Sequence, residues 1–154
     1  MTDFETIERA RLSGPGLRAF SKIADFWELD EAQRIAILGD PDQSTFRHWV
    51  FRSNAVDAVR LPHEVLLRIS ATLGIYKALR CLFSDHAQAL DWLESPHQGA
   101  SFEGASPLHL IVYGGQEGMM TVRRYLDAWC AGHTCRGVPE GSFAPVTEED
   151  VIFL

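Results

Sequence analysis

Residues 17–53 read LRAFSKIADFWELDEAQRIAILGDPDQSTFRHWVFRS and carry the helical pattern that decides the fold. Apolar residues of the first segment recur at spacings of three and four, which places them on one face of an α-helix. They are Leu17, Phe20, Ile23, Ala24 and Trp27. Upstream, Gly14-Pro15-Gly16 predicts a separation between this helix and a short charged N-terminal segment.

Two short helices are expected directly after this one. Asp30 is placed to cap the first of them, with Gln33 at the capping-box position, and Gly39 and Pro41 end it. The next helix follows within DQSTFRHWVFRS, residues 42–53. Two short helices joined by a glycine-containing turn give the outline of a helix-turn-helix, which many all-helical domains share.

A longer helix is predicted from Pro62 through Phe83, because proline suits the first turn of a helix. Its apolar residues form two stripes, which is more than one buried face requires. The first stripe holds Leu66, Ile69, Leu73, Tyr76 and Phe83, and the second holds Ile75, Leu79 and Leu82. Either one stripe packs internally and the other meets a second subunit, or both lie inside one compact bundle.

Three further helices complete the pattern. One spans Asp85–Leu93, and the next begins at Ser106-Pro107 and stops at Gly114-Gly115. The last carries an apolar face and ends near Gly132. Strand-like alternation is missing before residue 132, so the fold class predicted is all-α.

Composition places the chain among globular proteins, with 46% hydrophobic and 23% charged residues among 154. No apolar run reaches the length of a membrane helix, and the charged N-terminus does not resemble a signal peptide. Three cysteines suit a reducing cytoplasm. The net charge of −7 makes general nucleic-acid binding unfavourable, so a DNA contact needs a locally basic face.

Chemistry by the chain itself is not expected. Cys130, His133 and Cys135 supply at most three metal ligands at irregular spacing, so we expect no metal there. Motifs for a serine nucleophile, a phosphate loop or a zinc protease are missing from the sequence. We therefore predict no catalytic residues, no cofactor and no enzymatic activity.

The best candidate for DNA contact is the N-terminal half of the third helix. Residues 43–60 carry Arg47, Arg52 and Arg60 against the single acidic Asp57. In a helix-turn-helix this half reaches base edges and phosphates. The candidate DNA-binding residues are Gln43, Ser44, Thr45, Arg47, His48 and Arg52. The alternative is an ordinary solvated helix face.

Taken in order, three stretches resemble the Xre/MbcA/ParS-type antitoxins. They are AFSKIADFWELDEAQRIAILGDPDQSTFRHW (19–49), LPHEVLLRISATLGIYKALRCLF (61–83) and DWLESPHQGASFEGASPLHLIVYGGQEGMMTVRRYLDAW (91–129). The resemblance covers about residues 15–131, and its most specific pieces are LLRISATLGIYKALRCLF, DWLESPHQGASFEGASPLHL and VRRYLDAW.

The resemblance implies an antitoxin of a type II toxin–antitoxin pair that silences a RES-domain toxin, an enzyme that degrades NAD. It further implies a homodimer that binds operator DNA and represses its own operon. The expected parts are an Xre-like helix-turn-helix part at 15–60, a dimerisation and toxin-binding part at 61–131, and a tail at 132–154. A stand-alone helix-turn-helix regulator without a toxin partner is the alternative function.

Toxin binding falls, by the resemblance, on the glycine-rich region around Ser106. The candidate residues there are Phe102, Gly104, Ser106, Pro107, Leu108, Gly114, Val122 and Tyr125. In the tail, Glu148, Glu149 and Asp150 are expected to pair with basic residues of the toxin's substrate site, and Phe153 to fill an apolar pocket. The alternatives are that the glycines only allow close helix packing and that the tail is a frayed terminus.

Overall fold

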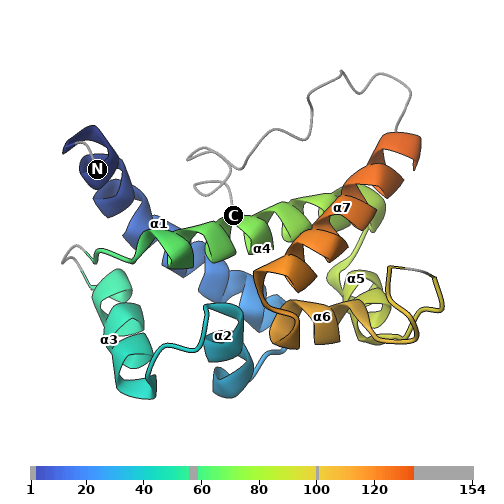
Figure 1. The fold of residues 1–154 in the computed structure, drawn as a ribbon, viewed down its shortest axis with the longest axis horizontal. Helices are drawn as coiled ribbons and strands as arrows, with labels where there is room; N and C mark the ends of the chain where they lie inside the picture. The colour runs from blue at the N-terminus through green and yellow to red at the C-terminus, as the bar shows by residue number, and fades with distance from the viewer. Residues whose placement is uncertain (1–2, 56–58, 100, 134–154) are drawn as a thin grey trace. The chain divides into compact units, whose positions relative to one another are not determined.

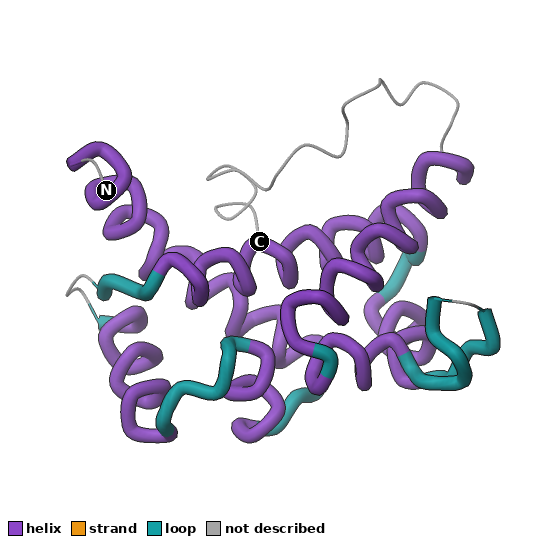
Figure 2. The backbone as a smooth tube through the Cα atoms, in the orientation of Figure 1, coloured by secondary structure: helices purple, strands orange, loops and turns teal. Residues whose placement is uncertain are grey.

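A computed structural model describes residues 3–55, 59–99 and 101–133 of the chain. Within these ranges the secondary structure consists of α-helices joined by loops and turns, without strands (Figure 2). In chain order they are α1 (Asp3–Phe26), α2 (Glu31–Ile37), α3 (Gln43–Asn54), α4 (His63–Leu82), α5 (His86–Glu94), α6 (Pro107–Tyr113) and α7 (Gly115–His133). The predicted all-α fold is confirmed (Figure 1).

The described residues form two compact units, and the boundary between them falls inside α4, between Leu73 and Gly74. The first unit contains α1 to α3 and the start of α4, and the second contains the end of α4 and α5 to α7. The division expected from sequence, at residues 60 and 61, stays a prediction.

The core of the first unit is centred on the face of α1 that the spacing predicts. All five apolar residues of that face, Leu17 to Trp27, are at most 3% exposed. Helix α3 packs against α1, and the Arg18 guanidinium donates a hydrogen bond to the carbonyl of Ser53. Burying such side chains stabilises a fold by roughly 1.5–3 kcal/mol each.

One sequence expectation is wrong: Gly14-Pro15-Gly16 does not separate a short N-terminal segment from the first helix. The helix runs through Pro15 without a break. Ser13 and Leu17, on either side, are fully buried, and the Ser13 hydroxyl accepts a hydrogen bond 2.9 Å long from the backbone N–H of Leu61. These contacts outweigh the helix-breaking tendency of proline, because tertiary packing overrides local propensity.

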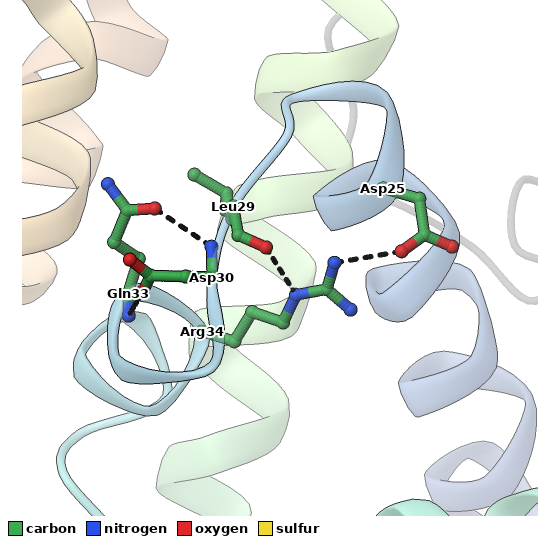
Figure 3. Close-up of polar contacts among 5 residues, drawn as sticks. All are labelled: Asp25, Leu29, Asp30, Gln33 and Arg34. Atoms are coloured by element: carbon green, nitrogen blue, oxygen red, sulfur yellow. Dashed lines mark hydrogen bonds and ion pairs between the residues drawn. The ribbon is translucent and has the colours of Figure 1, made fainter.

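Helix α2 begins at the capping box that the sequence predicts (Figure 3). The backbone N–H of Gln33 donates to Asp30 Oδ1 over 2.8 Å, and the backbone N–H of Asp30 donates to Gln33 Oε1 over 2.9 Å. Arg34 then ties α2 to the end of α1, donating to Asp25 Oδ1 over 2.8 Å and to the carbonyl of Leu29 over 3.0 Å. These contacts fix the angle at which the chain leaves α1.

Both apolar stripes of α4 contribute to the interior of the chain. Ile69, Leu73 and Tyr76 of the first stripe are buried, and so are Ile75 and Leu79 of the second. Leu66, Leu82 and Phe83, which complete the stripes, are half-buried, and whether a second subunit covers them stays a prediction. Within the second unit, Gly74 lies under the guanidinium of Arg123, which brings α7 close to α4.

Candidate partner-binding surface

Six side-chain rings gather in the second unit. They are Phe83, Trp92, His97, Phe102, Tyr125 and Trp129. The ring centroid of Trp92 lies 6.0 Å from that of Tyr125, with the planes 18° apart, and 5.8 Å from that of Trp129. Aromatic pairs at such separations add about 0.5–1.5 kcal/mol each beyond the area they bury.

The outer part of this group is open to solvent. Tyr125 is 41% exposed and Trp129 is 37% exposed, and the two lie one turn apart on the same face of α7. Trp92 of α5 lies half-buried against both rings. We call Trp92, Tyr125 and Trp129 the aromatic surface. Clustered exposed rings of this kind mark protein interfaces, where tryptophan and tyrosine are enriched.

A closed loop between α5 and α6 supports the aromatic surface. The backbone N–H of His97 donates to the carbonyl of Ala105 over 3.2 Å, and the N–H of Gly104 donates to the carbonyl of His97 over 2.8 Å. The His97 ring stacks on Trp92 at 5.1 Å, and its Nε2 lies 3.0 Å from the Trp92 carbonyl oxygen. The loop is thereby held at both ends.

Phe102 anchors the middle of this loop. It is 3% exposed, and its ring centroid lies 4.9 Å from that of Tyr125. The two following residues turn the chain with positive φ angles, 48° at Glu103 and 88° at Gly104. Glycine adopts such angles readily, so Gly104 allows the chain to turn back directly after Phe102.

A tight corner between α6 and α7 lies beyond the loop. Ser106 caps α6, its hydroxyl accepting from the backbone N–H of His109 over 3.1 Å, and Pro107 is the first helical residue. At the other end, a Cβ at Gly114 or Gly118 would overlap the carbonyl oxygen of Leu110. A side chain at either position would force the backbone of this corner to shift, because α6 and α7 pack closely there.

Comparison with known proteins connects this region to a family. Residues 78–132 match the family described as the antitoxin Xre/MbcA/ParS C-terminal toxin-binding domain. The matched range contains the whole ring group, the closed loop and the corner. A curated relative, the uncharacterized protein y4oB of Sinorhizobium fredii (strain NBRC 101917 / NGR234), is 39% identical over 116 residues, which cover 75% of this chain and 84% of the relative.

The chain belongs to the Xre/MbcA/ParS antitoxin family. No solved structure matches the antitoxin at a significant level. Its helices, over the residues that the structure describes, include none that is both long and apolar enough to cross a bilayer.

The toxin-binding residues expected from sequence fall into three groups in the antitoxin. Phe102, Pro107 and Val122 are buried, so their side chains shape the region from inside. Gly104, Ser106 and Leu108 are half-buried, whereas Gly114 and Tyr125 are exposed. Glu148, Glu149, Asp150 and Phe153 lie outside the described residues.

Sequence reasoning did not single out Trp92, Trp129 or Tyr113 for partner binding. Trp129 lies at helical spacing from Tyr125, a pattern that is equally typical of a buried face. Tyr113 is 67% exposed at the end of α6, beside the ring of His109 at 5.1 Å. The aromatic residues that recur in DWLESPH, VYGG and YLDAW were the one sequence feature that could have indicated an aromatic binding surface.

The candidate DNA-binding residues lie together on α3 of the antitoxin. Gln43, Ser44, Arg47 and His48 are exposed, and Thr45 and Arg52 are half-buried. Gln43 Nε2 donates to Glu31 of α2 over 2.6 Å, and Arg47 donates to the same carboxylate through two hydrogen bonds of 3.0 Å. The Arg47 guanidinium, followed by the Gln43 amide, lowers the pKa of Glu31. This carboxylate offsets part of the basic charge that the sequence indicates.

Two cysteines of the second unit lie near the ends of α4 and α7. Cys130 is fully buried, and its thiol donates to the carbonyl of Ala78 over 3.3 Å. Burial, followed by a hydrogen bond with the exposed Cys81, raises the pKa of Cys130 to about 12. Across the described residues, no three metal-binding side chains come together. Cys135, the third member of the sequence cluster, lies outside the described range.

Proposed function

We propose that this antitoxin neutralises a RES-domain, NAD-degrading toxin by covering it with the aromatic surface, and that the antitoxin is not itself an enzyme. The observation that carries the proposal is the exposure of Tyr125 and Trp129 inside the residues that match the toxin-binding family. Burial of such rings against a partner supplies much of the free energy of binding at interface centres.

Each part of this region has a separate role in the proposal. Tyr125 and Trp129 contact the toxin, and Trp92 backs both rings from α5. Phe102, Pro107 and Val122, which are buried, keep the loop and the corner in the binding shape. Gly104, Ser106, Leu108 and Gly114 present the backbone and the edges of the closed loop and of α6.

The tail provides the second contact in this proposal. Glu148, Glu149 and Asp150 enter the toxin's substrate site and pair with the basic residues that would otherwise hold the phosphates of NAD. Phe153 fills a neighbouring apolar pocket. The support is the sequence itself, since residues 132–154 carry four acidic side chains and one arginine. Deletion of residues 147–154 is expected to leave toxin binding intact and to restore NAD breakdown.

Autorepression of the operon by an antitoxin homodimer is the second part of the proposal. It is supported by the succession of α2, a turn with positive φ at Gly39 and Asp40, and α3. The exposed side chains at the start of α3 are those that contact DNA in helix-turn-helix proteins. Gln43, Ser44, Thr45, Arg47, His48 and Arg52 are the contacts proposed, in the cytoplasm of the producing cell.

Co-expression with a RES-domain enzyme encoded beside the antitoxin tests the main proposal. Wild-type antitoxin is expected to co-purify with the enzyme and to stop its NAD consumption. Tyr125→Ala with Trp129→Ala should weaken binding by 30-fold or more, since truncated hot-spot residues cost about 2 kcal/mol or more.

The matched control is Phe51→Ala, which removes an exposed aromatic ring from the first unit; Phe51 is 70% exposed. It should bind as the wild type does, and circular dichroism should show that all variants remain helical. If the double variant binds with wild-type affinity, the aromatic surface is not the contact. An antitoxin that binds operator DNA but no neighbouring enzyme would instead support the stand-alone regulator.

A further inference from the structure

The Cys81 and Cys130 pair joins α4 and α7 near the ends of both helices. Cys130 Sγ donates to the carbonyl of Ala78, which lies one turn before Cys81 on α4. Two residues beyond Cys81, the ring of Phe83 lies 5.8 Å from that of Trp129, the residue before Cys130. The two helices therefore approach each other on both sides of Cys81, as a disulfide between Cys81 and Cys130 requires.

The two thiols differ in access to solvent. Cys81 is exposed, whereas Cys130 is fully buried. A dissolved oxidant therefore reaches Cys81 first, and Cys130 can be oxidised only through its neighbour. An exposed thiol beside a second one is the usual arrangement of an attacking and a resolving cysteine.

We propose that peroxide converts Cys81 and Cys130 into a reversible disulfide that clamps α4 to α7. The Cys81 thiolate attacks one oxygen of hydrogen peroxide, which gives a sulfenic acid at Cys81 and releases the other oxygen as water. Cys130 then loses its proton and attacks the Cys81 sulfur. The S–S bond forms and the hydroxyl group leaves as a second water. Two thiols and one peroxide thus give one disulfide and two waters.

The second step is the slow one. Because burial holds Cys130 in its protonated form, only a small fraction of this sulfur is thiolate at neutral pH. The rate of disulfide closure should therefore rise with pH through the neutral and mildly alkaline range.

The clamp lies next to the aromatic surface along α7. Trp129 precedes Cys130 on α7, and Phe83 lies two residues beyond Cys81, with its ring centroid 5.8 Å from that of Trp129. A covalent bond there limits how far the end of α7 can move away from α4. The disulfide itself does not depend on the proposed toxin partner, so its test uses the antitoxin alone.

The experiment treats reduced, full-length antitoxin with hydrogen peroxide, blocks remaining thiols with N-ethylmaleimide and maps the tryptic peptides by mass spectrometry. Trypsin leaves Cys130 and Cys135 on one peptide, Tyr125–Arg136, so the Cys135→Ser variant is needed to assign the bond. The expected product joins the Cys81 peptide to that peptide within one chain, and dithiothreitol reverses it.

Two variants test the roles assigned to the two cysteines. Cys81→Ser changes an exposed side chain, should fold normally and should lose the cross-link. Cys130→Ala should retain a sulfenic acid at Cys81 that reacts with dimedone. If Cys135→Ser shows both remaining thiols alkylated, or a bond between two copies of Cys81, the proposal is wrong. A Cys130–Cys135 bond in the wild type would equally overturn it.

Discussion

Arg47 of α3 donates two hydrogen bonds to the carboxylate of Glu31 on α2, one from Nε and one from Nη2, each 3.0 Å long. Gln43 approaches the same carboxylate from the first turn of α3. Both side chains stand where a helix-turn-helix protein contacts DNA, so Glu31 occupies donors that a phosphate group would otherwise engage. The pair is solvent-exposed, which makes it easy for an anion to displace.

Glu31→Gln is therefore expected to strengthen binding of the antitoxin to its own promoter. The change removes a negative charge beside Arg47 and so should steepen the salt dependence of the dissociation constant by about one unit in the log–log slope. Fluorescence anisotropy of labelled promoter DNA across a salt series measures both quantities. Arg47→Ala with Arg52→Ala should have the opposite effect. Equal slopes for wild type and Glu31→Gln would show that this face does not contact phosphates.

Gly118→Ala should destabilise the second unit by about 2 kcal/mol, because the new methyl group overlaps a backbone carbonyl that cannot rotate away. Urea unfolding followed by circular dichroism gives the change in free energy. The matched control is Gly132→Ala in the same helix, where a Cβ meets nothing within 4 Å. That variant should be unchanged or up to about 1 kcal/mol more stable. Similar losses for both would indicate that the corner is not the cause.

The N-caps of α2 and α3 differ, and this difference can be tested by substituting each capping residue. Asp30→Ala removes the side-chain acceptor for Gln33 and should cost about 1 kcal/mol of stability. Asp42 is the N-cap of α3, but its side chain makes no capping hydrogen bond. Asp42→Ala should therefore cost clearly less in the same thermal or urea titration. An equal cost for both substitutions would contradict the assigned difference between the two caps.

Alkaline pH should destabilise the antitoxin through Cys130. The folded state holds this proton up to a pKa of about 12, whereas an unfolded cysteine loses it near pH 8.5 or 9. Between these values the unfolded state binds fewer protons, so the free energy of unfolding falls as pH rises, by up to about 1.4 kcal/mol per pH unit. Urea titrations at several pH values should show a steeper fall for wild type than for Cys130→Ala. Parallel curves would contradict the assignment to this thiol.

The sequence predicted helix beginnings better than helix interruptions. Asp30 and Ser106 mark helix starts correctly because capping is a local hydrogen bond between a side chain and the next turn. Pro15 misled the prediction because the contacts that keep α1 continuous come from distant residues such as Leu61. Local propensity holds no information about them.

The candidate site was only partly predictable for a similar reason. Tyr125 and Trp129 lie at a spacing that fits a buried face as well as an exposed one, and only the folded unit shows that their rings reach solvent. Gly114 is recognisable as a helix stop, but the overlap that a side chain at Gly118 of α7 would make with Leu110 of α6 depends on the angle between the two helices. The Glu31–Arg47 pair joins residues sixteen positions apart, which no helical periodicity links.

The neighbouring indole rings of Trp92 and Trp129, whose planes are 54° apart, also allow the second unit to be followed by spectroscopy without a label. The four tryptophans divide evenly, with Trp27 and Trp49 in the first unit and the other two in the second. Two indoles at 5.8 Å couple their electronic transitions, so the second unit should show an exciton couplet in circular dichroism that Trp27, almost wholly enclosed, does not contribute. Loss of that couplet would report rearrangement of the aromatic surface without any attached label.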